Sequence, residues 1–437
     1  MGARQLVVQL AFETHFMSVV NLSSFTPKTT VRSGSSFAGA LRTTRFAPAA
    51  PARPDAASVS EVVRLLAAAK RPLILFGRCR RTMDDWDRRI ALAEKLGARM
   101  LSDLKAGSMV PTDHRLHVGA PFNKMSTEAK VALREADVIL SLGWIDLGGA
   151  LHQAFDGGAI AAKIIHVGQD HHLHNGWGKE HCSLPPVDFH LAGDPDATAA
   201  DLLAALPDGE KPNETSHKRA PLPEAEASGD AINLRQIAGA LKAATGDQSV
   251  TFACLARAWP ADLWPHRHPL DYLGKDGGGG VGSGPGITIG AALALKDSGR
   301  LTVGVIGDGD CLMSMNALWT AAKYEIPALF IVANNRSYFN DELHQESVAR
   351  TRQRNVANRW IGQAIDNPIP DIASIARAQG IMAFGPIVNT GELAGILLEA
   401  VKTIRSGRPC LVDVHIDPGH GRAMMASTAT RSAAGGK

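Results

Sequence analysis

Short apolar runs alternate with amphipathic stretches along most of this chain, and that alternation restricts the fold more than any other feature. Runs of strand length lie at 73–76, 136–143, 163–167, 301–306, 328–332 and 410–414. Segments with apolar residues at helical spacing lie at 60–66, 91–96, 199–206 and 233–244. Strands that alternate with helices are typical of parallel sheets with helices on both faces. We therefore predict an α/β fold with two open parallel sheets.

The length and one polar stretch indicate how these elements divide into domains. The chain has 437 residues, about three times the length of a typical single domain. A stretch rich in Pro, Glu and Ser, residues 207–230, has no helical or strand periodicity and is typical of a linker. We predict a central domain over 58–206 and a second domain over 231–417. The polar tail, 418–437, is expected to be mobile.

Residues 1–57 differ in composition from the rest of the chain. Up to Arg53 the only acidic residue is Glu13, while Ser, Thr and Arg are frequent. This composition fits an organellar transit peptide, an unstructured extension or a mis-joined reading frame, and it leaves the three alternatives open. The run 47–54, rich in Pro and Ala, is typical of a linker. We treat 1–57 as an atypical extension and linker.

Charge and cysteine content narrow the class of function. The formal net charge is +3, with 46 Lys and Arg against 43 Asp and Glu and no basic stripe or acidic tail, which disfavours nucleic acid or a membrane surface as partner. The five cysteines are scattered and form no CxxC pair, so a reducing cytoplasm fits better than a disulfide framework. No apolar run reaches the roughly 18 residues of a spanning helix. We expect a cytoplasmic protein that acts on a small molecule.

Polar residues follow two of the predicted strands at the point where each ends. Gly307-Asp308-Gly309-Asp310 comes directly after the strand 301–306, and Asn334-Asn335 comes after the strand 328–332. Each cluster alone is most simply a turn. Together they fall at the carboxyl edge of a parallel sheet, where open α/β sheets bind ligands. Glycines let a backbone approach a diphosphate, and Asp308 and Asn335 carry the oxygen ligands that Mg²⁺ prefers.

The stretch from Gly307 to Asn335 resembles the cofactor motif of thiamine-diphosphate enzymes, which starts with Gly-Asp-Gly and ends with Asn-Asn after a helix of this length. The intervening residues 315–327 are similar to that helix in the acetolactate synthase and benzoylformate decarboxylase group. The resemblance implies that the side chains of Asp308 and Asn335 and the backbone carbonyl of Ser337 coordinate Mg²⁺. We expect the cofactor to contact Gly307, Gly309, Asp310 and Asn335.

A second segment carries the same resemblance. Residues 277–286 include four successive glycines and precede the apolar helix start 287–293. On its own such a run is typical of a flexible linker. It is similar to the family segment that holds the aminopyrimidine ring, which implies that the Gly279 carbonyl accepts from the exocyclic amine. Val281 is then the wedge that bends the cofactor, in place of the more usual Met, Leu or Ile, and Gly282 completes the cofactor contacts.

The first α/β unit also resembles these enzymes. Residues 72–77, 107–119 and 137–143 look like their central domain, and Gly193-Asp194-Pro195 looks like its closing strand-to-helix turn. Some members of the family bind FAD in this domain. Trp144-Ile145-Asp146 stands where the flavin-binding members carry a more basic segment, so we do not predict FAD.

We expect a third family domain to have no counterpart in this sequence. Full-length members begin with a pyrimidine-binding domain, whose glutamate contacts the cofactor N1′ nitrogen and promotes its activation. About fifty residues precede the central-domain match, and Glu13 lacks the surrounding pattern. We expect an amino-terminally truncated or mis-started sequence. The surface around Gly279, Val281 and Asn335 is then expected to cause self-association or to need a chain with a pyrimidine domain.

Three further clusters are given structural interpretations. A zinc site formed by the histidines at 171–174 with His181-Cys182 is the alternative to a solvated loop, which their irregular spacing favours. His266 and His268 are expected to be structural or exposed, with an acid–base role as the alternative. Residues 350–354 are expected to form a solvated helical face.

The predicted function is thiamine-diphosphate- and Mg²⁺-dependent chemistry on a 2-oxo acid or acyl substrate, as in decarboxylases and carboligases. The alternative is a cofactor-binding fragment or subunit without independent activity. We expect either a homo-oligomer or an assembly with a pyrimidine-domain chain.

Overall fold

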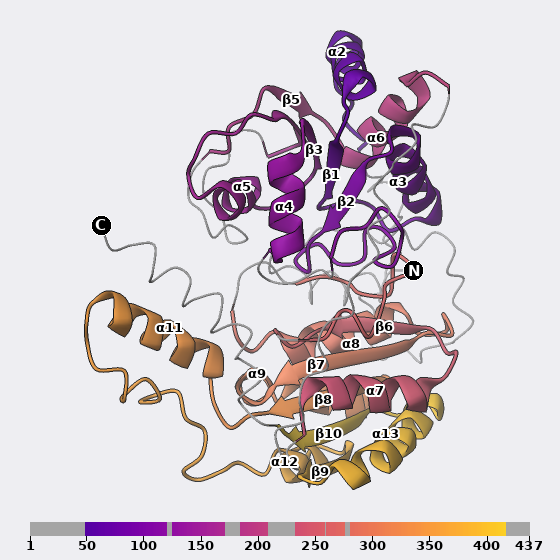
Figure 1. Cartoon of the computed structure of the whole chain (residues 1–437). Coiled ribbons are helices and arrows are strands. Elements are labelled where there is room, and N and C mark those ends of the chain that lie inside the picture. The colour runs from indigo at the N-terminus through magenta and orange to yellow at the C-terminus, as the bar shows by residue number, and fades with distance from the viewer. Residues whose placement is uncertain are drawn as a thin grey trace. The chain divides into compact units, whose positions relative to one another are not determined.

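The computed structural model describes residues 49–119, 125–170, 184–208, 232–257, 259–275 and 280–416 (Figure 1). By their internal contacts they form two compact units. Unit 1 consists of the described residues up to 208 together with 265–275, and unit 2 consists of 232–264 and 280–416. Several predictions concern residues that lie outside these ranges. They are Glu13, most of the linker 207–230, the histidines at 171–181 with Cys182, Gly279 and the tail 418–437.

Unit 1 is built on a five-stranded parallel sheet. Its strands lie in the order β2 (Arg99–Ser102), β1 (Pro72–Phe76), β3 (Val138–Leu142), β4 (Lys163–Gly168) and β5 (Phe189–Ala192). All residues of β1 and β3 are buried, as expected for strands covered on both faces. Parallel strands need crossover connections, and helices lie between β1 and β2, between β2 and β3, and between β3 and β4 along the chain.

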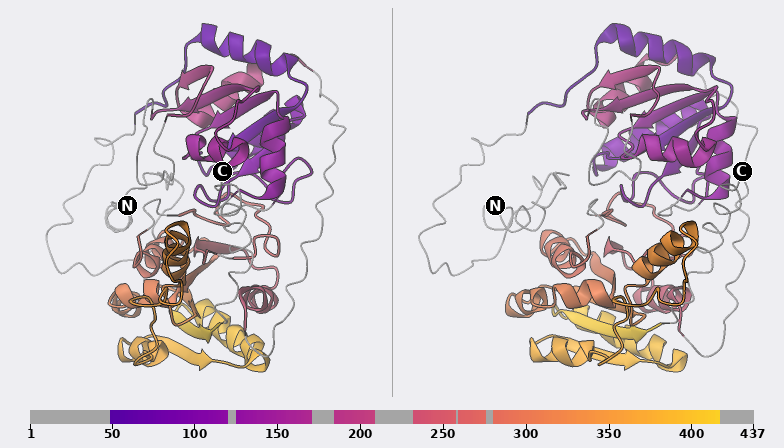
Figure 2. Two further views of the ribbon diagram at one scale, coloured as in Figure 1. Left: turned by 60° about the vertical axis from the view of Figure 1, so that its left-hand side comes forward. Right: turned by 90° about the vertical axis from the view of Figure 1, so that its left-hand side faces the viewer.

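The helices of unit 1 cover both faces of this sheet (Figure 2). Alternate residues of β1 point to opposite faces, so Ile74 and Phe76 enter one apolar core and Leu73 and Leu75 enter the other. The first core also receives side chains from α2 (Ala56–Ala68), α3 (Met83–Leu96) and α6 (Pro195–Ala205). The second receives side chains from α4 (Thr127–Glu135) and α5 (Leu147–Phe155).

Unit 2 repeats this design. Its parallel sheet has the order β6 (Val250–Cys254), β7 (Leu301–Gly307), β8 (Ala328–Asn334), β10 (Cys410–His415) and β9 (Met382–Ile387). One core lies between the sheet and α8 (Gly284–Ala294), α10 (Ala317–Lys323) and α12 (Ile372–Ala378). On the other side α7 (Leu234–Thr245) packs against α13 (Thr390–Arg405) (Figure 1). The predicted α/β fold with two parallel sheets is thus confirmed.

Two details of unit 2 differ from the sequence-based expectation. The helix expected after the Gly-Asp-Gly motif is two short helices, α9 (Asp308–Met313) and α10, because the backbone of Ser314 leaves the helical region. The expected helical face at 350–354 is wrong in part. α11 (Phe339–Thr351) ends at its second residue, and Gln353 has a left-handed φ of 52°. All five residues are exposed.

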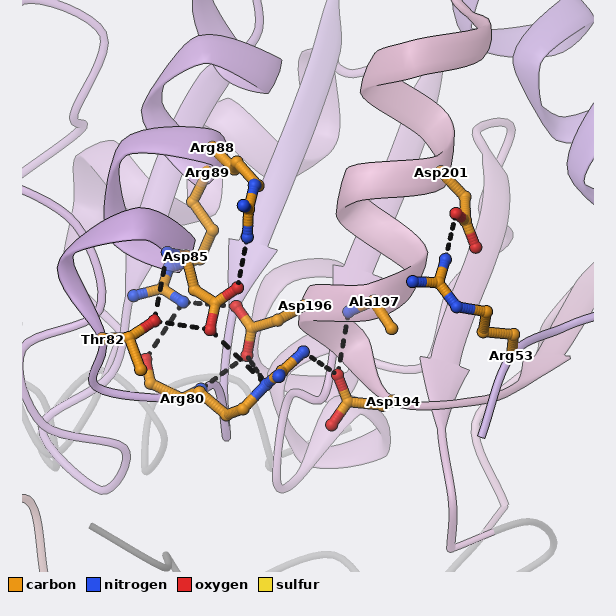
Figure 3. A network of polar contacts seen from close by, with 10 residues as sticks. All are labelled: Arg53, Arg80, Thr82, Asp85, Arg88, Arg89, Asp194, Asp196, Ala197 and Asp201. Atoms are coloured by element: carbon orange, nitrogen blue, oxygen red, sulfur yellow. Dashed lines mark hydrogen bonds and ion pairs between the residues drawn. The ribbon is translucent and has the colours of Figure 1, made fainter. Parts of the chain in front are cut away.

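A buried polar network joins α3 to α6 in unit 1 (Figure 3). The fully buried Arg89 donates to the carboxylate of Asp196, in the first turn of α6, and to the carbonyl of Met109 at 2.8 Å. Asp196 also accepts from the backbone amide of Arg80 at 2.5 Å. Burial raises the pKa of Asp196, and the Arg89 charge opposes that rise. The network therefore fixes the start of α6 against the loop that follows β1.

Residues 265–275 form a strap that is bound to the other residues of unit 1. The half-buried Arg81 donates through its guanidinium to the carbonyls of Pro269, Tyr272 and Leu273 at 2.8, 2.9 and 2.6 Å. The backbone at Gly107 also lies close to the backbone of the strap. A Cβ at Gly107, where φ is +85°, would lie only 2.6 Å from the Tyr272 carbonyl oxygen. The strap is thus held by side chain and backbone of the loops after β1 and β2.

The strap also carries His266, which lies in the interior of unit 1 at 1% exposure. Its backbone amide donates to Thr112 Oγ1 at 2.9 Å. Neither ring nitrogen has a hydrogen-bond partner among the described residues, and burial lowers the pKa of His266 to about 4. His266 is therefore a buried, neutral imidazole at neutral pH. Among the described helices of both units, none is long and apolar enough to cross a membrane.

Candidate cofactor and metal site

The two polar clusters picked out by the sequence meet at the carboxyl edge of the unit 2 sheet. β7 and β8 are neighbours in parallel register, with Gly307 opposite Ala333. One residue further along, Asp308 begins α9 and Asn334 ends β8, so they lie side by side at the edge. The expectation that these clusters come together is confirmed by this register. Their role toward a cofactor remains a prediction.

Asp308 is the most constrained group at this edge. Its side chain is buried, at 2% exposure, and the nearby backbone amides of Asp308, Gly309, Ser337 and Arg336 favour its charged form. Its Oδ2 atom has no partner among the described residues. Burial raises the pKa of Asp308 to about 6, although these amides act in the opposite direction. A buried carboxylate oxygen without a partner is a suitable ligand for a divalent cation.

The loop after β8 brings the other two expected ligand residues to Asp308. Asn335 Oδ1 accepts from the Ser337 amide at 3.0 Å and retains a second lone pair for a cation. Arg336 takes a left-handed φ of 59°, which turns the chain sharply between them. The Ser337 hydroxyl donates to Glu342 in α11. Asn335 and Ser337 thus share one tight loop that follows β8, next to the strand end that carries Asp308, and their role as metal ligands remains a prediction.

Asp310 ties the glycine segment to the same edge. Its Oδ1 atom accepts from the Gly282 amide at 2.5 Å, and the Gly284 amide lies 3.4 Å away. Gly284 admits no side chain, because a Cβ would lie 2.1 Å from Asp310 Oδ2. Gly282 has a φ of +105°, which favours glycine. Asp310 therefore holds the start of α8, and Val281 beside it is 43% exposed.

The two glycines of the motif have different surroundings. A Cβ at Gly307 would meet nothing within 4 Å, so the backbone at the end of β7 borders open space. A Cβ at Gly309 would lie 2.2 Å from the ring of Tyr338. Gly307 thus leaves room for a ligand that approaches the backbone, whereas Gly309 leaves room for Tyr338 to pack on α9.

Two further residues at this edge were not assigned a role from the sequence. Asn334 Nδ2 donates to Asp413 Oδ1 on β10 at 3.0 Å, and both side chains are buried. Burial raises the pKa of Asp413 to about 6, and the nearby Asp308 charge adds to that rise. The sequence contains a signal for Asp413, since it is the one charged residue in the apolar run 410–414.

A metal at this edge would not need a cluster of acids and histidines. Among the described residues no group of three or more His, Cys, Asp or Glu side chains is arranged to hold a metal ion. The expected ligands are one carboxylate, one amide oxygen and one backbone carbonyl, with the remaining positions left for phosphate and water. Mg²⁺ is usually bound in this way, by few carboxylates together with substrate phosphates.

Both units are open parallel sheets covered by helices, and unit 2 has polar side chains at the carboxyl edge of its sheet. Open α/β sheets bind their ligands at this edge. Comparison with protein families identifies two domains in this chain. Residues 254–414 match the C-terminal TPP binding domain of thiamine pyrophosphate enzymes, and residues 59–202 match their central domain. The chain belongs to the thiamine pyrophosphate enzyme family.

Individual relatives come from the groups that the sequence resembles. The acetolactate synthase large subunit of Haemophilus influenzae is 22% identical over 371 residues, which are 82% of this chain and 61% of that protein. The benzoylformate decarboxylase of Pseudomonas aeruginosa is 32% identical over 156 residues, 34% of this chain and 25% of that protein. This chain thus spans about three fifths of the length of the acetolactate synthase subunits that it matches.

A solved structure has the same fold. The benzoylformate decarboxylase of Polynucleobacter necessarius superposes with a TM-score of 0.66 at 19% identity, over 85% of this chain and 66% of that one. At this identity the likeness supports the fold of the two units and not a shared substrate.

Proposed function

We propose that this chain binds thiamine diphosphate through Mg²⁺ at the carboxyl edge of unit 2 and takes part in decarboxylation or carboligation of 2-oxo acids. The observation that carries the proposal is the buried Asp308 carboxylate, whose Oδ2 atom has no hydrogen-bond partner among the described residues. The domain matches support thiamine diphosphate as the cofactor. Mg²⁺ and the substrate class are our extension of that finding.

The residues at this edge fit a magnesium diphosphate. Asp308 would supply a carboxylate ligand, and Asn335 and Ser337 would supply an amide and a carbonyl oxygen. Gly307 leaves the open space that a phosphate needs beside the backbone. Asp310 holds the glycine segment in place through the Gly282 amide, so that Val281 can support the cofactor ring.

The chain's contribution is binding and orientation. When bound, thiamine diphosphate supplies a nucleophilic carbon and an electron sink for cleaving or forming the bond beside a 2-oxo carbonyl. Around it, Asp308 would anchor the diphosphate through the metal, beside the partly buried loop after β8. Fixed anchoring of a cofactor at one end positions its reactive atom at the other.

A second candidate function is cofactor binding without independent turnover. The described residues of unit 2 account for the diphosphate end of the cofactor. Glu13, the weak candidate for the acid that activates the cofactor, lies outside the described residues. A subunit that binds the cofactor and relies on another chain for activation would show the same unit 2 geometry.

One paired experiment separates the two functions. Thiamine diphosphate is titrated calorimetrically into the full chain with Mg²⁺, and the same sample is assayed for carbon dioxide release from pyruvate and from benzoylformate. Binding with release supports the enzyme, and binding without release supports the subunit. Absence of metal-dependent binding contradicts both.

A further inference from the structure

We infer that Asp413 is a positioning residue for the Mg²⁺ site: through Asn334 it holds the loop 335–337, from which two of the three expected ligands come. This inference rests on the proposed function. Asp413 lies on β10, is not expected to touch metal or cofactor, and would act only through Asn334.

The contacts form a continuous path from β10 to the loop. Asp413 Oδ1 accepts from Asn334 Nδ2 at 3.0 Å, and Asn334 Oδ1 accepts from the Arg336 amide at 3.1 Å. The Arg336 amide also faces the Asp308 carboxylate. These two partners set the orientation of the Asn334 side-chain amide. The Arg336 N–H needs the Asn334 oxygen as acceptor, and the Asp413 carboxylate needs the Asn334 NH₂ group as donor. Asp413 therefore determines which way Asn334 faces.

The backbone around Asp413 is fixed as well. The Asn334 carbonyl accepts from the Ile416 amide at 2.9 Å, and β8 and β10 stay in register up to the pair of Asn334 with His415. On the other side of β10, Gly385 approaches so closely that a Cβ there would lie 2.6 Å from the Asp413 carbonyl oxygen. Asp413 thus stands in regular pairing with β8, the strand that carries Asn334, although the register with β9 shifts between Val412 and Val414.

Burial of this carboxylate has no structural explanation in the core alone. Asp413 is 1% exposed, and its Oδ2 atom has no partner among the described residues. Burying a carboxylate with an unsatisfied oxygen costs free energy that an apolar residue of similar volume would not. A buried residue of this kind is often retained because it holds metal ligands in place without binding the metal itself. Loss of such a residue lowers metal affinity by about 10–100-fold.

The first test needs neither metal nor cofactor. Hydrogen exchange of the Arg336 and Ser337 amides is measured in the cofactor-free full chain for wild type, Asp413→Ala, Asp413→Asn and Asn334→Ala. We expect faster exchange in Asp413→Ala and Asn334→Ala and near wild-type exchange in Asp413→Asn, because an amide oxygen can still accept from Asn334. Asp196→Asn in unit 1 is the control for loss of a buried carboxylate. Exchange in Asp413→Ala equal to wild type would overturn the inference.

The second test measures the metal. The Mg²⁺ concentration for half-maximal thiamine diphosphate binding should rise about 10–100-fold in Asp413→Ala. It should stay within a few-fold of wild type in Asp413→Asn and in Asp196→Asn. The double variant Asp413→Ala/Asn334→Ala should be no weaker than either single variant, because both interrupt one path. Additive losses would contradict action through Asn334.

Failure of this inference differs from failure of the proposed function. If Asp308→Ala abolishes metal-dependent binding while Asp413→Ala leaves it unchanged, only the role of Asp413 is wrong. If Asp308→Ala has no effect, the site itself is wrong. Should Asp413→Ala fail to fold, Asn334→Ala carries both tests, since it breaks the same path and keeps the charge.

Discussion

At the scale of single residues, the edge of unit 2 combines buried charge with space for a ligand. Asp308 and Asp413 are both almost fully buried, and the pKa of each is raised to about 6 by burial. A buried Asp308 carboxylate, whose Oδ2 atom has no partner among the described residues, is more favourable in its charged form when a cation is bound to it. This gives a physical reason for a metal at the site in addition to the family motif.

The two motif glycines provide a matched pair of variants. Gly309→Ala should lower the free energy of unfolding of the cofactor-free chain by about 1–3 kcal/mol, because the new methyl group collides with the Tyr338 ring. Gly307→Ala should change it by less than about 1 kcal/mol, because its Cβ meets open space. Urea denaturation of both variants measures this.

In Gly307→Ala and Gly309→Ala, the change in cofactor affinity should not parallel the change in the free energy of unfolding. Gly307→Ala fills the space expected to receive the diphosphate, so it should weaken thiamine diphosphate binding although the fold is intact. If Gly307→Ala binds as wild type does, the diphosphate does not approach the backbone at the end of β7.

At the scale of elements, α3 and α6 are joined by a buried ion pair between Arg89 and Asp196. Each of these side chains compensates the buried charge of the other. Arg89→Met should destabilise unit 1 by about 3–5 kcal/mol, because it leaves Asp196 charged and buried. The double variant Arg89→Met/Asp196→Leu should recover most of that loss. Thermal or urea denaturation of the full chain tests this.

A neighbouring arginine is the control for this prediction. Arg88 pairs with Asp85 at 3.0 Å, but its side chain is 47% exposed, so Arg88→Ala should cost less than about 1 kcal/mol. Equal losses for Arg88→Ala and Arg89→Met would show that burial of the pair does not matter.

The strap 265–275 gives unit 1 a defined response to acid. Burial lowers the pKa of His266 in the folded chain to about 4, below its ordinary value of 6.5, so unfolding takes up a proton at pH values between these two. The contribution of His266 is complete above pH 6.5 and is lost as the pH falls toward 4. At pH 5 the loss amounts to about 2 kcal/mol by linkage.

Replacing the imidazole tests this sign. His266→Leu removes the titrating group while filling a similar volume, so its free energy of unfolding should fall less than that of wild type between pH 7 and pH 5. Urea denaturation at both pH values measures the difference. A larger acid-induced loss in His266→Leu than in wild type would contradict a neutral, buried His266.

At the scale of the whole molecule, the sequence predicts the fold class and the meeting of the two motifs well. Long apolar strands such as β7 and β8 are evident as runs, and parallel strands place their carboxyl ends at one edge. Short strands such as β2 and β9 are not, because four to six residues with charged or half-buried positions carry little pattern.

The remaining features depend on long-range contacts that no local pattern reports. Asp413 meets Asn334 across 79 positions of sequence, and Arg81 meets the strap across about 190. The strap lies between two segments of unit 2 in sequence but contacts unit 1, so continuous domain boundaries could not have revealed it.

Assembly is the prediction that belongs to the whole molecule. We expect the full chain to self-associate, or to gain solubility and activity only with a chain that carries a pyrimidine-binding domain, because the half-exposed Val281 borders the proposed site. Sedimentation velocity of the chain alone and after co-expression measures this. A well-behaved monomer that decarboxylates 2-oxo acids unaided would contradict it.

The central claim is that Asp308 binds thiamine diphosphate through Mg²⁺, and calorimetric titration of wild type and Asp308→Ala tests it most directly. Wild type should bind the cofactor with Mg²⁺ and lose binding when the metal is chelated. Asp308→Ala should show no metal-dependent binding at the same concentrations, while Asp308→Asn should show weakened binding. Equal, metal-dependent affinity in wild type and Asp308→Ala would contradict the account.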